Sequence, residues 1–535
     1  MLFNSYIFIF LFLPLCLVGF YILQKRKATL AKVWLTCFSL WFYGYFNYKY
    51  LLIMLGSIAG NYMVHVWIVE KQKKEADNRP AGNVENKESW KKPKYGIANS
   101  KGILSVGIGL NLLVLGYFKY FDFFLENINS LFGSSIPLKN ILLPLGISFF
   151  TFQQISFLVD SYRGELDTVS FLDYALFVSF FPQLIAGPIV IHEEMLPQFE
   201  RIGKDDRSSE ERTEIFIKGI YVFVLGLAKK ILIADTFGRA VDLAFSNVNG
   251  INGLESLLTI LFYSLQLYFD FSGYCDMAKG IAGMFGMRIA NNFNSPYKAV
   301  NIVDFWKRWH ITLSRFFTKN IYIPLGGNRK GELRMYLNYF IIFFLSGIWH
   351  GAGWNFVLWG LMHGVLYIIT KWWMKQKQKA YIAQEGENTC EEAGILVKLQ
   401  DKILQTISCV LTFLYVSVAW VYFRAASMEQ GTSLLRNLFV KDWTMPGSGF
   451  ADCFNLGEFW YVLKILKIAA MPYAQYYLMA LFTAAALGIV FFGKNVEELA
   501  TKFKTGILNA LVTALLFIWC VVSLSGVSTF LYFNF

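Results

Sequence analysis

The 535-residue chain is poor in charged residues, histidines and paired cysteines. Charged side chains make up 16% of the sequence and apolar side chains 56%, whereas a soluble protein has about 25% charged residues. This balance excludes an ordinary soluble chain and indicates several helices across a membrane. The seven cysteines form no CxxC pair. Neither a zinc site nor a dithiol redox motif is therefore indicated, and we expect no metal and no bound cofactor.

Signature motifs of several enzyme classes are missing as well. The sequence contains no GxSxG, no P-loop and no HExxH, so a hydrolase elbow, a nucleotide-binding loop and a zinc protease site are not indicated. The net charge is +12, but the basic residues cluster in loops, as membrane orientation requires. Because no basic patch with aromatic residues stands outside the apolar context, we expect no nucleic-acid partner.

Apolar segments of the length that crosses a bilayer, about 20 residues, recur along nearly the whole chain. Several are short or interrupted, so we expect about eleven transmembrane helices plus re-entrant and interfacial ones. The first lacks a basic start and an A-x-A site, and we interpret it as a retained helix whose N-terminus lies outside. No internal repeat is visible, which argues against an inverted-repeat transporter. The segments are 3–23, 29–47, 50–69, 103–125, 141–159, 171–191, 214–233, 254–270, 336–350, 354–373, 403–423, 469–492 and 507–531.

Three polar regions separate these segments. Residues 70–101 and 374–402 are rich in Lys, Glu and Gln or Asn and predict cytoplasmic loops. Residues 288–335 differ, because they hold nine Lys or Arg and only two Asp or Glu among many aromatic residues. We expect amphipathic helices there, at the cytoplasmic face. Such a basic, aromatic collar suits a phosphate-rich, partly apolar ligand or phospholipid headgroups, and the residue types leave both open.

Two of the five histidines stand in apolar sequence near small residues. His350 belongs to SGIWHGAGWNF and His363 follows thirteen residues later. The stretch Gly351–Ala352–Gly353 predicts a helix break, which would place His350 at a helix end. A histidine in a cavity there would be suited to act as a general base, because its pKa lies near neutrality. A hydrogen-bonded structural histidine is the alternative for both.

The other ionisable residues are more ambiguous. His310 in WKRWHITLS is flanked by tryptophans of the kind found in an interfacial belt, His65 is interpreted as structural, and His192 is left open. Asp270 and Asp276 do not share a helical face, since six residues turn the helix by 240°. Asp276 has the spacing to pair with Lys279, so these carboxylates predict ion pairs or helix-break ligands, not an acid–base dyad.

Seven long stretches carry a recognisable pattern in their order and spacing. They are GYFKYFDFF (116–124), LPLGISFFTFQQISFLVDSYRG (143–164), FFPQLIAGPIVIHEEMLPQF (180–199), YFDFSGYCDMAKGIAGMFGMRIANNFNSPY (268–297), DFWKRWHITLSRFFTKNIYIPLGGNRKG (304–331), WHGAGWNFVLWGLMHG (349–364) and FLYFNF (530–535). Together they resemble the membrane-bound O-acyltransferase (MBOAT) family, in particular its polysaccharide-acetylating branch, and the resemblance covers nearly the full chain.

The resemblance implies an all-α polytopic fold, one MBOAT domain over 1–535, with helices around a central tunnel and residues 288–335 as a catalytic region. His350 matches the family's catalytic histidine and His310 its second functional histidine, whereas His363 matches only a recurring HG. The resemblance implies acetyl-CoA as the co-substrate, bound from the cytoplasmic side. It also implies a multi-pass protein of the plasma (inner) membrane, in contact with membrane lipids. The residues that we expect to contact substrate are Lys307, Arg308, Trp309, Trp349 and Asn355.

The mechanism that follows is acyl transfer. His350 would take the proton of an acceptor hydroxyl, which then attacks the thioester, while His310 would position the donor or His350, or stabilise developing charge. The acceptor would be an extracytoplasmic polysaccharide, of unassigned identity, or a serine of an SGNH-type acetyltransferase partner outside. Two alternatives remain: D-alanyl transfer to teichoic acid within the same family, and a polysaccharide exporter or flippase.

Overall fold

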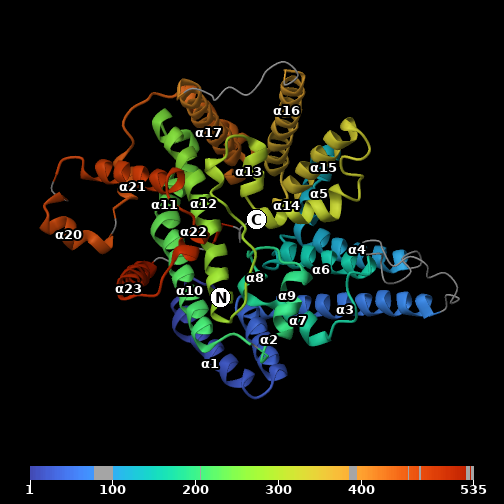
Figure 1. The fold of residues 1–535 in the computed structure, drawn as a ribbon. Helices are drawn as coiled ribbons and strands as arrows, with labels where there is room; N and C mark the ends of the chain where they lie inside the picture. Colours follow the sequence, from blue (N-terminus) through green and yellow to red (C-terminus); the bar gives the residue numbers. More distant parts are fainter. Residues whose placement is uncertain are drawn as a thin grey trace. The chain divides into compact units, whose positions relative to one another are not determined.

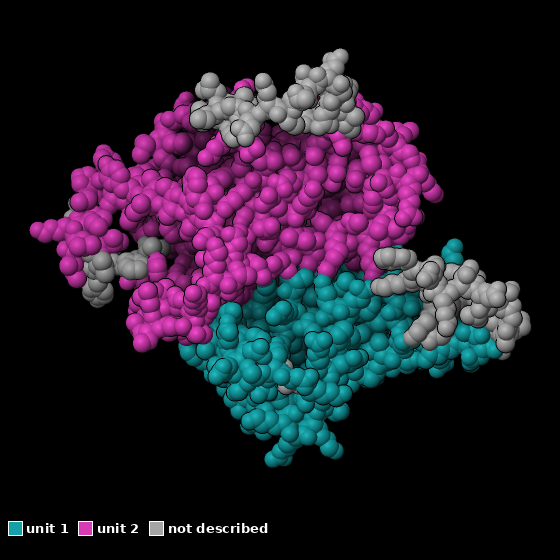
Figure 2. Space-filling model, viewed as in Figure 1, with its two compact units in different colours: residues 1–220, 278–290 teal, residues 221–277, 291–535 magenta. Residues whose placement is uncertain are grey.

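The computed structural model describes residues 1–77, 100–204, 206–384, 395–455, 457–468, 471–525 and 530–531. Every regular element within those ranges is a helix (Figure 1), in agreement with the predicted all-α class. The chain divides into two compact units, which Figure 2 colours separately. Unit 1 comprises residues 1–220 and 278–290, and unit 2 comprises residues 221–277 and 291–535.

Unit 1 contains the N-terminal helices. Leu158 of α6 packs with Val64 and Ile68 of α3 and Leu104 of α4 in one apolar cluster. The helices are η1 (Phe8–Phe12), α1 (Leu13–Gln24), α2 (Ala28–Gly44), α3 (Tyr48–Asp77), α4 (Lys101–Leu115), η3 (Gly116–Tyr120), α5 (Phe121–Phe132), α6 (Ile147–Tyr162), α7 (Phe171–Ser179), α8 (Phe181–Leu184), α9 (His192–Glu200), the first part of α10 (Ser209–Ala228) and the end of α12 (Gly253–Met284).

Unit 2 contains the remaining helices around an aromatic core. Trp420 of α17 has its ring centroid 4.9 Å from that of Trp309 and 5.5 Å from that of Trp359, and all three are fully buried. Besides the rest of α10 and α12, the helices are η4 (Lys229–Ala234), α11 (Asp235–Ser246), η5 (Val248–Gly250), η6 (Pro296–Lys298), α13 (Ile302–Arg308), α14 (Ile311–Phe317), η7 (Thr318–Tyr322), α15 (Glu332–His350), α16 (Trp354–Gln384), α17 (Ile395–Arg424), α18 (Met428–Val440), α19 (Ser448–Asp452), η8 (Gly457–Phe459), α20 (Trp460–Ile465), α21 (Ala474–Phe491), α22 (Val496–Lys502), α23 (Ile507–Val522) and η10 (Ser523–Ser525).

Four helical stretches within the described ranges are long and apolar enough to cross a membrane. They are Tyr48–Asp77, Lys101–Phe132, Gln400–Arg424 and Ala474–Phe491. Two shorter apolar helices, Phe8–Gln24 and Ile507–Val522, accompany them. The other predicted segments also contain helix, but their helices are shorter, interrupted or more polar. The predicted number of about eleven transmembrane helices therefore stays a prediction.

Helix ends differ from the sequence prediction in several places. The segment 171–191 is not one helix, because α7 ends at Ser179, Pro182 stands in the next short helix α8, and Gly187 and Pro188 follow. Helix α3 continues to Asp77 and α16 to Gln384, into the segments predicted as loops, and α17 begins at Ile395, inside the second of them. Their Lys, Glu and Gln residues favour helix even without apolar neighbours, which explains the extension. The rest of those loops, 78–99 and 385–394, lies outside the described residues.

Helices α15 and α16 lie side by side (Figure 1) and approach closely at two glycines. A Cβ atom on Gly360 would lie 2.4 Å from the carbonyl oxygen of Phe343, and one on Gly347 would lie 2.6 Å from that of Phe356. Both distances are shorter than a normal contact, so only glycine fits. Small residues let helix backbones approach in this way. The contact fixes the last turns of α15, where His350 stands, against α16.

The carboxylates of α12 form buried ion pairs, as predicted, but with unpredicted partners. Asp276 binds Lys229 of η4 at 2.6 Å, a partner that the i,i+3 spacing to Lys279 did not indicate. Asp270 binds Lys230 at 2.6 Å and also accepts the backbone N–H of Leu531 at 3.0 Å. The lysines come from a helix distant in sequence, so one-helix spacing could not identify them. These pairs join η4 to α12 and to the C-terminal residues.

Candidate active site

His350 stands at the last position of α15, and α16 begins at Trp354. The helix break predicted from Gly351–Ala352–Gly353 is therefore confirmed. The Nδ1 atom of His350 lies 2.7 Å from the backbone carbonyl oxygen of Ser346, one turn earlier. A carbonyl oxygen only accepts hydrogen bonds, so Nδ1 carries the proton and Nε2 carries the lone pair. This is the tautomer that a general base needs at Nε2.

His310 precedes α14 in the left-handed backbone region, with φ 46° and ψ 52°. Such a conformation is strained for a residue other than glycine. Its Nδ1 lies 3.1 Å from Oδ1 of Asn292, and that oxygen also accepts from the backbone N–H and the hydroxyl of Thr312. The three donors identify Oδ1 as the acceptor, so Nδ1 of His310 is protonated. Its Nε2 therefore carries the lone pair as well.

The two histidine rings lie close together in unit 2. Their centroids are 6.4 Å apart, and the indole of Trp349 lies 4.8 Å from the His350 ring and 6.2 Å from the His310 ring. His310 is fully buried and His350 is 3% exposed. Burial lowers the pKa of His310, which lies outside the predicted spans, well below its ordinary value, and nearby His350 lowers it further. His310 is thus neutral at pH 7.

Aromatic side chains surround His350. Besides Trp349, the rings of Trp359 and Phe423 lie 4.8 Å and 5.3 Å from its centroid. His350 as a residue is only 3% exposed, so little of its side chain is open to a substrate in this conformation. The aromatic neighbours also exclude water, which strengthens electrostatic interactions at the ring.

A cavity of about 440 Å³ lies beside this pair, also within unit 2. Ser346, whose carbonyl binds His350, is one of its lining residues, and His350 itself is not. Lys307 and Arg315 supply positive charge, and the stacked rings of Tyr322 and Tyr339 supply a flat apolar wall. A cavity that combines cations with aromatic surface is suited to a phosphate-bearing ligand with an apolar or heteroaromatic part.

The residues predicted to contact substrate fall into different environments. Lys307 is exposed and lines the cavity. Arg308 does not line it; its Nε donates to Asp304 at 2.9 Å. Trp349 faces both histidines, whereas Trp309 is buried and lies 5.6 Å from Phe305 in a stacked geometry. The roles of these residues stay predictions.

Asn355 is buried at the start of α16. Its amide nitrogen donates to the carbonyl oxygens of Tyr422, at 3.1 Å, and Ala425, at 2.8 Å. Both acceptors stand at the end of α17 or just after it, so Asn355 ties α16 to α17. Because both N–H groups of this amide donate within the protein, the predicted contact with substrate would have to use the side-chain oxygen as an acceptor.

The remaining histidines lie in other surroundings. His65 has Nδ1 2.8 Å from Ser161 Oγ, and its Nε2 accepts the Val169 N–H at 3.4 Å, which suits the predicted structural role. His192 lies 3.1 Å from Asp160. His363 is fully buried among aromatic rings and neither ring nitrogen has a hydrogen-bond partner in the described residues. Within the same residues, no group of three His, Cys, Asp or Glu could hold a metal ion.

Asn292, Ser346, Arg315 and the pair Tyr322–Tyr339 were not identified from the sequence. Asn292 acts through residues 18 and 20 positions away, and Ser346 acts through its backbone, so neither leaves a motif. Arg315 follows in the same basic, aromatic stretch as Lys307, and the charge of that stretch was the available signal.

The chain is similar to several known proteins. The model of the membrane-bound O-acyltransferase (MBOAT) family matches residues 104–418, a stretch that includes both histidines. The chain belongs to the MBOAT family. A peptidoglycan O-acetyltransferase of Helicobacter pylori is 40% identical over 465 residues, which cover 82% of this chain and 80% of that protein. A probable alginate O-acetylase, AlgI, of Pseudomonas aeruginosa is 33% identical over 493 residues, 91% of this chain and 84% of that protein.

A more distant MBOAT relative has a different named activity. The teichoic acid D-alanyltransferase of Bacillus subtilis is 30% identical over 254 residues, which cover 45% of this chain and 62% of that protein. Family membership and the apolar helices make this chain a membrane protein and an acyltransferase. The exporter alternative drawn from the sequence is thereby set aside.

Proposed function

We propose that the protein transfers an acetyl group from cytoplasmic acetyl-CoA to a hydroxyl group of an extracytoplasmic polysaccharide, from a site in the inner membrane. The observation that carries the proposal is the hydrogen bond from Nδ1 of His350 to Ser346, because it directs the lone pair to Nε2 beside a second buried histidine. An imidazole in this tautomer is able to take the proton of an attacking hydroxyl.

In the proposed reaction, Nε2 of His350 accepts the hydroxyl proton as the oxygen attacks the thioester carbonyl. The carbon–sulfur bond then breaks, the proton passes to the leaving thiolate, and the products are an O-acetyl ester and CoA. His310 holds its lone pair at Nε2 and is neutral, so it accepts a hydrogen bond instead of donating one to an oxyanion. Of the three roles expected for it, positioning is favoured over charge stabilisation.

The donor site is proposed at the cavity beside Ser346. Lys307 and Arg315 are placed to bind the phosphates of CoA, and Tyr322 and Tyr339 to contact its apolar or heteroaromatic parts. In the proposal, acetyl-CoA is a co-substrate that the reaction consumes, and no bound cofactor takes part. The single domain over 1–535 and the cytoplasmic position of residues 288–335 remain part of the proposal.

Acetyl transfer is proposed over D-alanyl transfer because relatives named as O-acetyltransferases match most of the chain, whereas the D-alanyltransferase of B. subtilis matches less than half of it. The acceptor is proposed as a glycan because those relatives are named for peptidoglycan and alginate. Where the protein does not reach the glycan directly, we propose that a serine of an SGNH-type partner acetyltransferase accepts the acetyl group first.

The test uses the purified full-length protein with acetyl-CoA labelled in its acetyl group. We expect the labelled acetyl group to be transferred to an added glycan. When no acceptor is present, slow hydrolysis should release labelled acetate. The matched reaction supplies an aminoacyl carrier protein as donor. Transfer from the carrier protein and not from acetyl-CoA would reject the acetyl proposal in favour of D-alanylation. Mass spectrometry of surface glycans from cells with and without the gene then identifies the acceptor polymer.

A further inference from the structure

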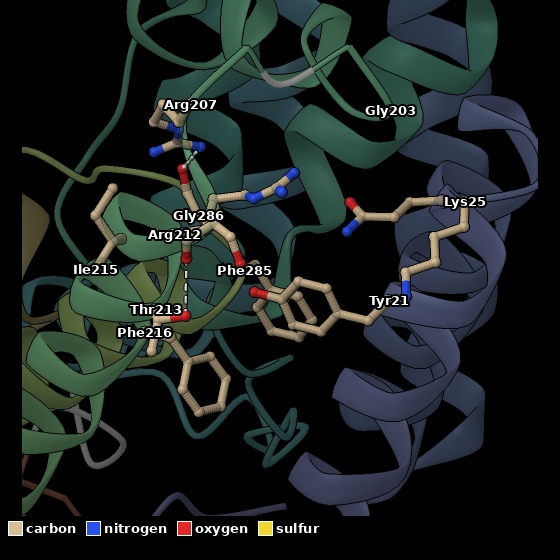
Figure 3. Close-up of a pocket in the computed structure, with 12 residues that line it drawn as sticks. Tyr21, Lys25, Gly203, Arg207, Arg212, Thr213, Ile215, Phe216, Phe285 and Gly286 are labelled. Carbon is tan, nitrogen blue, oxygen red and sulfur yellow. Dashed lines mark hydrogen bonds between the residues drawn. The ribbon is translucent and has the colours of Figure 1, made fainter.

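A second cavity, of about 420 Å³, lies wholly within unit 1, whereas the candidate catalytic residues belong to unit 2. Figure 3 shows its walls. The end of α1 forms one side with Tyr21 and Lys25, and the start of α10 forms the other with Arg212 and Thr213. No role has been given to this cavity so far.

The lining of this cavity is positively charged. Lys25 stands on the α1 side, and Arg207 and Arg212 stand on the α10 side (Figure 3). The described lining residues include no Asp or Glu. Arg207 is fixed to the wall, because its Nη2 donates to the carbonyl oxygen of Gly286 at 3.2 Å. Three cations that converge on one cavity without a carboxylate favour an anion there.

The rest of the lining is partly apolar. The rings of Phe216 and Phe285 line the cavity beside the ring of Tyr21, whose hydroxyl is already donated to the Met284 carbonyl. Gln24 and Ser209 contribute neutral polar groups. A small inorganic anion would leave the aromatic surface uncovered, so the lining is better matched by an anion that carries apolar groups.

Helix α1 shows where those apolar groups would come from. Four side chains on it and on η1, which continues directly into it, are about half exposed and recur at spacings of four, three and four residues: Leu11, Leu15, Val18 and Ile22. This spacing places them on one face of the helix. Lys25 follows Ile22 by three residues and continues the same face into the cavity. In a membrane protein, an exposed apolar stripe on a short apolar helix such as Phe8–Gln24 is suited to contact with lipid chains.

We propose that the unit 1 cavity binds the headgroup phosphate of a phospholipid with net negative charge, whose acyl chains lie along the exposed face of α1. Lys25 and Arg212 bind the phosphate from opposite walls, and Arg207 adds positive charge from its fixed position. The glycerol part lies against Phe216 and Phe285. The cluster QKRK at 24–27 places this site on the cytoplasmic side, where anionic lipids attract basic residues.

The test measures lipid binding and not acyl transfer. The full-length protein, purified in detergent, is titrated with dioleoyl phosphatidylglycerol, and bound lipid is counted by native mass spectrometry. The double variant Lys25→Gln/Arg212→Gln should bind about twenty-five-fold more weakly, since each basic side chain near a lipid phosphate contributes about fivefold. Dioleoyl phosphatidylcholine, which has the same chains and no net charge, should bind more weakly than phosphatidylglycerol to the unmodified protein.

The matched control is Arg26→Gln/Lys27→Gln. It removes the same amount of charge, from the basic run that contains Lys25, but neither residue lines the cavity, so its affinity for phosphatidylglycerol should stay within about twofold of the unmodified protein. Equal losses in the two double variants would overturn the proposal, as would equal binding of the two lipids. Displacement of the lipid by millimolar inorganic phosphate would overturn it in favour of a free-phosphate site. Gel filtration and thermal unfolding without lipid verify that both variants fold.

Discussion

The rings of His310 and His350 lie 6.4 Å apart, and each has its Nδ1–H bound to an oxygen of the protein, Asn292 Oδ1 and Ser346 O respectively. In their neutral forms, both imidazoles therefore have the same tautomer, with the two Nε2 atoms as the basic nitrogens. We propose different roles for the two rings. His350 removes the hydroxyl proton, and His310 accepts a hydrogen bond that orients His350 or the substrate.

The tautomer of His310 predicts a change in pH dependence. In the unmodified protein, burial keeps the pKa of His310 well below its ordinary value, so its titration should not limit kcat/KM between pH 6 and 8. Asn292→Asp places a carboxylate on Nδ1, and an opposite charge raises the pKa of the imidazole. Below that raised pKa, Nε2 is protonated and no longer accepts. The variant should therefore lose activity as the pH falls towards 6, in pH profiles of kcat/KM. Parallel profiles for the two proteins would contradict the assigned role.

The cavity predicts different effects for two adjacent basic residues. Lys307→Gln should raise the KM for acetyl-CoA by about 10- to 100-fold with little change in kcat, because a hydrogen bond to a charged group contributes about 1.5–3 kcal/mol. Arg308→Gln is the matched control: Arg308 is bound to Asp304 and does not line the cavity, so its effect should be smaller. Initial rates at varied acetyl-CoA measure both constants. A larger increase in KM for Arg308→Gln than for Lys307→Gln would contradict the proposed location of the donor site.

The close contact of α15 and α16 predicts a stability effect. Gly360→Ala places a methyl group 2.4 Å from the Phe343 carbonyl oxygen and should destabilise the protein by about 1–3 kcal/mol through overpacking. Gly60→Ala is the control, since no atom lies within 4 Å of the added Cβ in helix α3, and alanine favours a helix by about 0.5–1 kcal/mol. Thermal unfolding in detergent should show a lower midpoint for the first variant and an equal or higher one for the second. A midpoint for Gly360→Ala equal to that of the unmodified protein would contradict this packing.

The ion pair Lys229–Asp276 predicts a second stability effect. Asp276→Asn leaves a lysine that is only 15% exposed without its counter-charge, which costs about 3–5 kcal/mol for a buried pair. The double variant Lys229→Met/Asp276→Leu removes both charges and should recover most of the loss, because apolar residues of similar size replace buried pairs well. Unfolding midpoints compare the three proteins. A double variant less stable than Asp276→Asn would show that the two residues do not act as a pair.

Local sequence was enough to predict some of these features. The glycines after His350 predicted the helix break, and the apolar segments predicted the helices, because both depend on neighbouring residues. The partner of Asp276 could not be predicted, since Lys229 lies 47 residues earlier and on another helix. The same holds for Asn292 and the tautomer of His310, and for the cavity that Lys307 shares with Tyr339. Those contacts depend on packing between elements that sequence spacing does not specify.

The most direct test of the central claim is the rate of acetyl transfer by His350→Asn. The asparagine amide nitrogen takes the place of Nδ1 and keeps a donor for the Ser346 carbonyl, but the variant has no basic nitrogen at the position of Nε2. With unchanged folding and membrane insertion, and a control variant His65→Gln at a hydrogen-bonded histidine of unit 1, the account predicts that His350→Asn loses about 10²–10⁴ in rate. A rate within tenfold of the unmodified protein would contradict the assignment of His350 as the general base.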